Sequence, residues 1–217
     1  MKVLVTGFQP FGGSTVNPAY EAVKLLPASI GEAEIVKLEL PVVLGEGGDM
    51  LIEAIEKERP DIVICVGQAG GRAALTVERV GINLRECGGF PDNAGNAPDG
   101  EKIREDGENA YFATVPVKAM VKRCREQGIP AALSYTAGSH VCNDVMYTLL
   151  YHLKRHHPDV TGGFIHVPFA IEQGVGVLKP ASTPTMPVPY IAKGLVCCIE
   201  AAIAGTEETL ADSGATH

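Results

Sequence analysis

The run Asp61–Val66, Asp-Ile-Val-Ile-Cys-Val, constrains the fold more than any other stretch of this chain. It is apolar at consecutive positions, it is short, and it ends at Gly67, so it predicts a strand that is buried on both faces. Strands of this kind occur in parallel sheets whose two faces are covered by helices. The run therefore predicts a central sheet inside an α/β protein.

Other strand-like runs alternate with segments of helical pattern, which is the order expected of an α/β fold. We expect further strands at Lys2–Val5, Ala33–Leu40, Val77–Leu84, Ala131–Tyr135 and Thr161–Val167. We expect helices at Asn17–Leu26, Glu46–Glu58, Val117–Glu126, Val141–His156 and Pro187–Ala204. This alternation predicts one three-layer α/β/α domain over residues 1–205, with a mostly parallel (mixed) central sheet, and a flexible tail over residues 206–217.

Charge and composition exclude several functional classes. The 217 residues carry a formal net charge of −8 and contain no basic block, so a nucleic-acid partner is not expected. No stretch approaches the roughly 18 apolar residues of a membrane span, and the N-terminus opens directly into a strand without the pattern of a signal peptide. Six cysteines show no CxxC pair, so we expect reduced thiols and a cytoplasmic protein.

Polar segments follow several of the predicted strands, where ligands bind in open α/β sheets. These segments are Gly7–Asn17, Gly67–Arg72, Ala137–Asn143 and His166–Gln173. The stretch Arg85–Gly107 is long, polar and rich in Gly, Pro and Asn, and loops of that length are usually functional or disordered. The site is therefore expected among these segments.

Cys142 is the best candidate nucleophile among the thiols. It follows the turn Ala137–Val141 in the first turn of a predicted helix, where the helix dipole and free backbone N–H groups favour the thiolate. The same N–H groups could stabilise a developing oxyanion. The alternative is a buried cysteine that packs as a small apolar residue.

His166 is the best candidate base, because it lies at the end of an apolar strand, where sites form. The alternative is a histidine of the core. His152 and His156 are four residues apart and could bind a metal, but the sequence lacks the glutamate of an HExxH motif, so this signal is weak.

Glu78 is the first candidate for an acid that orients the histidine, and Glu172 is the second. Glu78 stands beside Arg79 inside an apolar strand, and buried charges are usually paired, so a structural salt bridge between the two is the alternative. Phe8 and Phe11 lie in a loop that lacks the Gly-Lys-Ser/Thr of a phosphate loop. Each phenylalanine could either pack on the core or line an apolar pocket.

Six motifs, in order along nearly the whole chain, resemble those of the pyroglutamyl peptidase I family of cysteine peptidases. The matching segments are Gly7–Gly12 with Asn17-Pro18, Gly67–Arg72, Glu78–Asn83, Pro91–Asn93, Ala137–Asn143, and Phe164–Phe169 with Glu172-Gln173. The resemblance implies a triad of Cys142 as nucleophile, His166 as base and Glu78 as the orienting acid. It also implies a single α/β/α domain, no metal or cofactor, a cytosolic location and a homotetramer.

The substrate that the resemblance implies is a peptide with an N-terminal pyroglutamyl residue. Pyroglutamate is a flat lactam without the charged amine that ordinary aminopeptidases bind. The family positions matched here by Phe8, Phe11, Gln68, Phe90, His140 and Val141 line its pocket. A pocket that hydrogen-bonds the lactam is expected to reject proline, which lacks the ring carbonyl.

Two positions depart from the family pattern. Gly89-Phe90 stands where the family usually has Arg-Ile, so the usual arginine near the reacting carbonyl is absent, and Arg85 is a possible substitute. His140 replaces a residue that is commonly aromatic in the family. Two other functions are therefore kept as alternatives. One is a nucleoside phosphorylase-like enzyme, which needs a phosphate site of convergent arginine and hydroxyl groups that Arg72 and Arg79 alone do not supply. The other is a binding module that has lost its activity.

Overall fold

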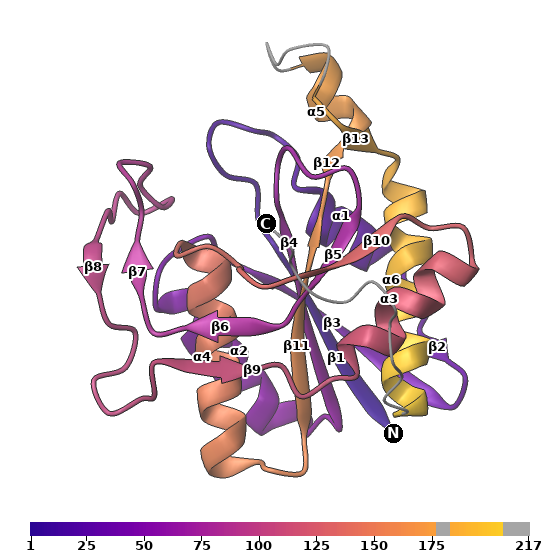
Figure 1. The fold of residues 1–217 in the computed structure, drawn as a ribbon, viewed down its shortest axis with the longest axis horizontal. Helices are drawn as coiled ribbons and strands as arrows, with labels where there is room; N and C mark the ends of the chain where they lie inside the picture. Colours follow the sequence, from indigo (N-terminus) through magenta and orange to yellow (C-terminus); the bar gives the residue numbers. More distant parts are fainter. Residues whose placement is uncertain (177–182, 206–217) are drawn as a thin grey trace.

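The computed structural model describes residues 1–176 and 183–205, and these residues form a seven-stranded central sheet covered by helices (Figure 1). The helices are α1 (Pro18–Lys24), α2 (Glu46–Glu58), α3 (Val117–Glu126), α4 (Val141–His156), α5 (Ile171–Gly176) and α6 (Val188–Ala204). The strands of the central sheet are β1 (Lys2–Phe8), β2 (Ser29–Ile30), β3 (Ala33–Leu40), β4 (Ile62–Gln68), β5 (Leu75–Glu78), β10 (Ala131–Ser134) and β11 (Thr161–Val167). The tail predicted at residues 206–217 lies outside the described residues.

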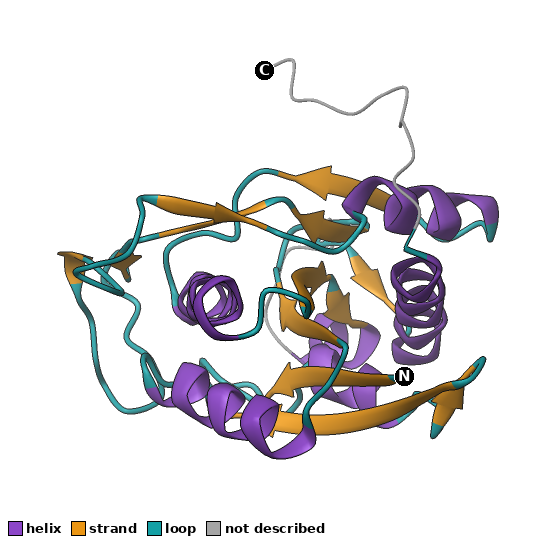
Figure 2. Ribbon diagram, turned by 90° about the horizontal axis from the view of Figure 1, so that it is seen from below, coloured by secondary structure: helices purple, strands orange, loops and turns teal. Residues whose placement is uncertain are grey.

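The strand order in the sheet is β10-β5-β11-β4-β1-β3-β2. Neighbouring strands are parallel except for the β5–β11 and β2–β3 pairs, which are antiparallel. Helices α2 and α4 pack together on one face, and α1, α3 and α6 pack on the other (Figures 1 and 2). The predicted three-layer α/β/α architecture with a mostly parallel sheet is therefore confirmed.

The local signals in the sequence explain these elements. The run that begins at Asp61 forms β4, whose residues Ile62–Gly67 are all buried. Asn17 caps α1 by accepting a hydrogen bond from the Ala19 N–H, and Pro18 occupies the first helical turn. The helices of the two outer layers pack their apolar faces inward, and their buried side chains form one continuous core with those of the sheet.

The single strand predicted at Val77–Leu84 is wrong, because the chain leaves the sheet at Arg79. Strand β5 ends at Glu78, and after Arg79 the chain forms β6 (Val80–Ile82), which pairs with β9 (Ala110–Phe112) beside α4. Arg79 does not pair with Glu78, since its guanidinium lies 5.4 Å from the centre of the Phe112 ring. Successive side chains of a strand point to opposite faces, which separates the two charges.

The stretch predicted as a long polar loop is well organised. It contains a short hairpin of β7 (Arg85–Glu86) and β8 (Asp99–Glu101). Between these strands, the buried Asp92 carboxylate accepts hydrogen bonds from the N–H groups of Leu44, Ala94 and Asn96. Two further short strands, β12 (Phe169–Ala170) and β13 (Thr185–Met186), pair outside the central sheet. Across the described ranges, the helices are all too short or too polar to span a bilayer.

Candidate active site

The register between β5 and β11 brings Glu78 next to His166. Phe164 is paired with Glu78 and His166 with Thr76 in this antiparallel pair, so the four side chains share one face of the sheet. The Nδ1–H of His166 donates a hydrogen bond of 2.8 Å to Oε1 of Glu78. Both side chains are buried. Of the two acids proposed from the sequence, Glu78 is therefore the one that contacts the histidine, whereas Glu172 is exposed on α5.

Cys142 reaches the same face of the sheet from the N-terminus of α4. A Cβ atom built on Gly67 would lie only 2.9 Å from the Cys142 sulfur, so the missing side chain of Gly67 leaves the space that the sulfur fills. Gly67 is the partner of His166 across the β4–β11 pair, and neighbouring strands are about 4.8 Å apart. The thiol thus lies over the strand beside His166. Because Nδ1 of His166 is bonded to Glu78, Nε2 is the ring nitrogen available to the thiol.

The environment keeps Glu78 ionised and His166 neutral. Burial raises the pKa of the Glu78 carboxyl, but the hydrogen bond to His166 and the charges of His166 and Arg72 outweigh it, so the pKa is lowered from its ordinary value. Burial lowers the pKa of the His166 imidazole, although the hydrogen bond and charge of Glu78 act in the opposite direction. At neutral pH the pair is therefore a carboxylate and a neutral imidazole, which is the state that a general base requires.

The sequence-based expectation of a thiolate at Cys142 is not met in the resting state. Cys142 does lie in the first turn of α4, as predicted. Burial nevertheless raises the pKa of its thiol to about 12, the charge of Glu78 adds to the rise, and Arg72 opposes it. Desolvation disfavours the anion more strongly than the helix N-terminus favours it. The thiol is therefore neutral at rest, so it could act as a nucleophile only beside a base that accepts its proton.

Arg72 is a residue of the site whose role sequence analysis missed. Its Nη1 donates to Oε1 of Glu78 at 2.6 Å and also to the hydroxyl of Thr76, and its Nη2 donates to the Thr136 carbonyl at 3.1 Å. The guanidinium thus holds the same carboxylate oxygen that contacts His166. The available signal was the burial of Glu78 itself, because a buried carboxylate requires a cation or several donors.

Arg72 and Arg79 do not form a phosphate site. Arg72 is bound to the Glu78 carboxylate and to neighbouring acceptors, whereas Arg79 lies against Phe112 after the chain has left the sheet. A phosphate site needs basic groups that converge on one anion. The two arginines therefore give no support to a nucleoside phosphorylase-like reaction.

A cleft of about 510 Å³ opens over Cys142 and His166, a volume within the range of small-ligand sites. Six residues proposed from the sequence line it, namely Phe11, Gln68, Phe90, His140, Cys142 and His166. The cleft is also lined by Arg72 and by the turn Ala137–Ser139 that precedes α4. The structure thus brings together segments that lie far apart in the chain.

Phe8 and Val141 are core residues in this structure and do not line the cleft. Phe8 is the last residue of β1, only 2% exposed, and its ring lies 6.3 Å from that of Phe164. Val141 is 1% exposed in the main hydrophobic cluster. Of the two phenylalanines that the sequence left undecided, Phe8 packs on the core and Phe11, three residues further along, lines the cleft.

An aromatic rim borders the cleft and is formed by Phe11, Phe90 and His140. The rings of Phe11 and Phe90 meet edge to face at 6.4 Å, and the ring of His140 lies 6.1 Å from that of Phe90. Nε2 of His140 is also 2.9 Å from the Phe90 carbonyl oxygen. His140 therefore fixes the loop that carries Phe90, whose side chain is half exposed.

Gln68 lies at the end of β4 and is fixed through its side chain. Its Oε1 accepts a hydrogen bond of 2.8 Å from Nε2 of Gln173, which is itself buried. Arg85, considered from the sequence as a substitute for the missing arginine, does not line the cleft. Its Nε donates to Oδ1 of Asp144 at 2.6 Å. Arg85 therefore does not bring a cation into the cleft.

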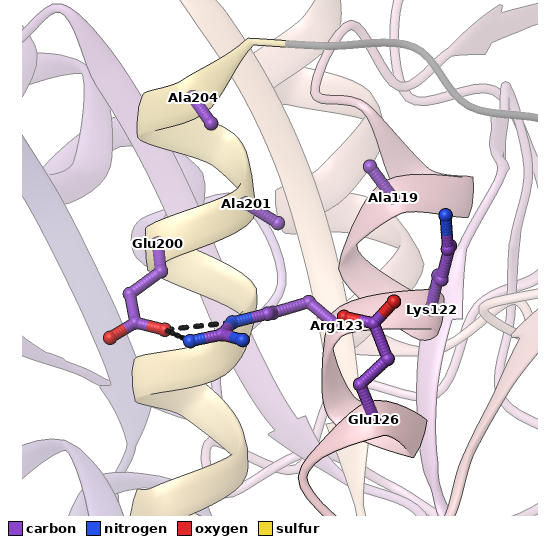
Figure 3. Close-up of a pocket in the computed structure, with 7 residues that line it drawn as sticks. All are labelled: Ala119, Lys122, Arg123, Glu126, Glu200, Ala201 and Ala204. Atoms are coloured by element: carbon purple, nitrogen blue, oxygen red, sulfur yellow. Dashed lines mark hydrogen bonds and ion pairs between the residues drawn. The ribbon is translucent and has the colours of Figure 1, made fainter.

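A second hollow lies between α3 and α6 (Figure 3) and is of a different kind. Arg123 extends from α3 and donates two hydrogen bonds to one carboxylate oxygen of Glu200 on α6, at 2.9 and 3.0 Å. The rest of the lining consists of Ala119, Ala201, Ala204 and the charged Lys122 and Glu126. The lining has no thiol, hydroxyl or imidazole, so the candidate active site remains the cleft at Cys142.

Comparison with known proteins identifies the family of the chain. The family model described as "Pyroglutamyl peptidase" matches residues 1–205. The pyrrolidone-carboxylate peptidase of Enterococcus faecalis is 52% identical over 217 residues, which cover all of both chains. The crystal structure of pyroglutamyl peptidase I from Bacillus amyloliquefaciens is 47% identical, with a TM-score of 0.90 over 96% of this chain and 99% of that one. The pyrrolidone carboxyl peptidase of Thermococcus litoralis is 36% identical, with the same TM-score over 96% and 99%. The chain therefore belongs to the pyroglutamyl peptidase family of cysteine-type peptidases.

Proposed function

We propose that this protein removes the N-terminal pyroglutamyl residue from peptides, with Cys142 as nucleophile, His166 as general base and Glu78 as the group that orients the histidine. This assignment rests on one arrangement of side chains. Oε1 of Glu78 lies 2.8 Å from Nδ1 of His166, and Gly67, the residue paired with His166 on the next strand, leaves space for the Cys142 sulfur. A thiol, an imidazole and a carboxylate in this order form a nucleophile, a base and an orienting acid.

The reaction proceeds in two steps. Nε2 of His166 takes the thiol proton while the Cys142 sulfur attacks the pyroglutamyl carbonyl carbon, and a tetrahedral oxyanion forms. The C–N bond then breaks as the imidazolium gives its proton to the leaving amine, and a thioester remains on Cys142. Water, deprotonated by His166, attacks the thioester, the C–S bond breaks, and the sulfur regains its proton as pyroglutamate leaves.

The first turn of α4 supports stabilisation of the oxyanion. The first N–H groups of a helix have no partner within the helix, and the N-cap residue of α4, His140, makes no side-chain hydrogen bond to them. These N–H groups lie in the same turn as the Cys142 backbone. They can therefore donate to an oxygen on the carbon that the sulfur attacks, with the positive end of the helix dipole behind them.

Recognition of the lactam is assigned to the cleft beside the thiol. The Phe11 ring and the exposed Phe90 ring offer apolar faces to a flat, uncharged ring. Because the Gln68 side chain is bonded to Gln173, the backbone at Gln68 is the group that we assign to the polar edge of the lactam. The tetramer and the cytoplasmic location that the family resemblance implies stay predictions, and light scattering in solution measures the first.

The protein is expected to release a fluorophore from a pyroglutamyl amide at least about 10³ times faster, in kcat/KM, than from the matching prolyl amide. The two rings have the same shape, but proline lacks the lactam carbonyl and leaves the polar groups of the pocket unpaired. Comparable rates would contradict the lactam assignment. Binding of free pyroglutamate without any turnover would instead indicate a binding module that has lost its activity.

Gly67→Ala is expected to lower kcat/KM for the pyroglutamyl amide by about 100-fold, because a Cβ there displaces the Cys142 sulfur. The same Cβ would also lie 2.8 Å from the Phe164 ring, so lost stability is a competing cause. A second variant, Gly67→Ala with Phe164→Leu, relieves the ring contact only. It is expected to remain slow, and recovery of the rate in this variant would show that the sulfur is not displaced.

A further inference from the structure

Two imidazoles and a carboxylate converge where the last turn of α2 meets the end of α4. Oε1 of Glu56 lies 3.2 Å from Nε2 of His152 and 2.6 Å from Nε2 of His157. The three atoms all lie within 4.8 Å of one another. The sequence suggested a metal pair of His152 and His156, whereas the structure combines His152 with His157 and adds Glu56 from another helix.

A neighbouring arginine holds the Glu56 carboxylate, and the two imidazoles are largely buried. Nη2 of Arg59, the residue that ends α2, lies 3.2 Å from the other Glu56 oxygen, so Oε1 remains turned toward the imidazoles. The side chains of His152 and His157 are only 11% and 15% exposed, whereas that of Glu56 is 41% exposed. The cluster is therefore held by two packed helices and is open to solvent on one side.

The donor set and its spacing suit a zinc-like cation. Imidazole nitrogen and carboxylate oxygen bind Zn²⁺ at about 2.0–2.2 Å, which places tetrahedral ligand atoms about 3.4 Å apart. The distance of 3.2 Å between Oε1 of Glu56 and Nε2 of His152 is already close to this spacing. The distance of 2.6 Å between Oε1 of Glu56 and Nε2 of His157 must increase by about 0.8 Å. Arg59 would then act as an outer partner that orients the ligating carboxylate.

We propose that Glu56, His152 and His157 bind one divalent cation of the Zn²⁺ type, with water at the fourth position, and so join the end of α2 to the end of α4. Each nitrogen ligand would be a neutral imidazole that gives up its hydrogen bond to Glu56 in exchange for the metal bond. The site lies at the opposite end of α4 from Cys142. Fifteen residues of helical rise separate Cys142 from His157, about 22 Å.

The test uses Co²⁺ as a spectroscopic probe on the full-length Cys142→Ala protein, which lacks the catalytic thiol. We expect one Co²⁺ per chain, with visible absorption bands of nitrogen and oxygen ligation and without the intense ultraviolet band of a cobalt–thiolate bond. Zn²⁺ should displace the Co²⁺ and should raise the melting temperature, because it binds the folded state only. A thiolate band would place the metal on the remaining cysteines and would overturn the proposal.

The variants His157→Gln and Glu56→Gln are expected to weaken Co²⁺ binding at least about tenfold, since each removes one direct ligand. Glu53→Gln is the matched control, because Glu53 is an exposed glutamate of the same helix, outside the cluster. The Glu53→Gln variant should bind Co²⁺ with the same affinity as the parent protein. Equal affinity in the parent and in the two ligand variants, or no binding to the parent at millimolar cation, would reduce the cluster to a set of hydrogen bonds and overturn the proposal.

Discussion

Cys142→Ala is expected to abolish turnover of a pyroglutamyl amide, with a loss in kcat on the order of 10⁵-fold or more, while the protein still folds. Removal of the nucleophile eliminates the thioester route, and the nucleophile and base of such triads act as one unit. The alanine lacks only the sulfur beside Gly67, so the surrounding packing is retained. The measurement is steady-state release of the fluorophore, with circular dichroism as the check of folding.

The matched control is Cys197→Ala, which removes a buried thiol of α6 outside the cleft and should keep the activity of the parent protein. Thiol alkylation should block the parent enzyme, and chelators should leave its rate unchanged, because the proposed reaction uses no metal. Near-normal activity of Cys142→Ala would remove the nucleophile assignment. Loss of activity with EDTA, while circular dichroism shows that the protein remains folded, would favour a metal-dependent mechanism.

His166→Asn is expected to lower kcat about as much as loss of the nucleophile, and Glu78→Gln is expected to lower it less, by roughly 10³-fold. The imidazole takes part in proton transfer, whereas the carboxylate only holds the ring and its tautomer. Parallel kinetics of the two variants at one pH give this ranking. A Glu78→Gln variant that is slower than His166→Asn would require the roles to be reassigned.

The pH profile separates orientation by Glu78 from a purely structural role. Burial lowers the pKa of His166 below 6.5, and Glu78 partly opposes this by favouring the protonated ring. The base must be neutral in the free enzyme, so the acid limb of kcat/KM should lie below pH 6.5. Glu78→Gln removes the opposing charge and should move this limb to still lower pH. An unshifted limb would mean that the carboxylate does not act through the imidazole.

The same shifts predict how stability depends on pH. Since the folded pKa of His166 lies below its value of 6.5 in the unfolded chain, the unfolded state binds more protons between the two values. Stability therefore falls as the pH drops from 6.5 toward the folded pKa. The lowered pKa of Glu78 acts in the same direction at more acid pH, because its contribution is lost as pH falls through its folded pKa.

The difference between Phe8 and Phe11 shows where local sequence reasoning stops. Both lie after a short apolar run, and nothing in their immediate neighbours separates them. Strand β1 extends to Phe8, which places that ring against Phe164 in the core, and the turn that follows frees Phe11 to line the cleft. The extent of a strand depends on its partner strands, so this outcome required the sheet.

The chain's own pattern determined the α/β architecture, the buried strand β4 and the position of Cys142 at the start of α4, because these follow from local periodicity and capping. Local reasoning also named Cys142, His166 and Glu78 as candidates, and the resemblance in motifs joined them into one implied triad. The tertiary structure alone decided that β5 runs antiparallel to β11, which puts Glu78 against His166 and Arg72 against Glu78. It alone indicated that the surroundings of the Cys142 thiol raise its pKa, so that the thiol is neutral at rest. Strand register and burial arise from contacts between segments far apart in the chain, so the local sequence pattern does not determine either of them.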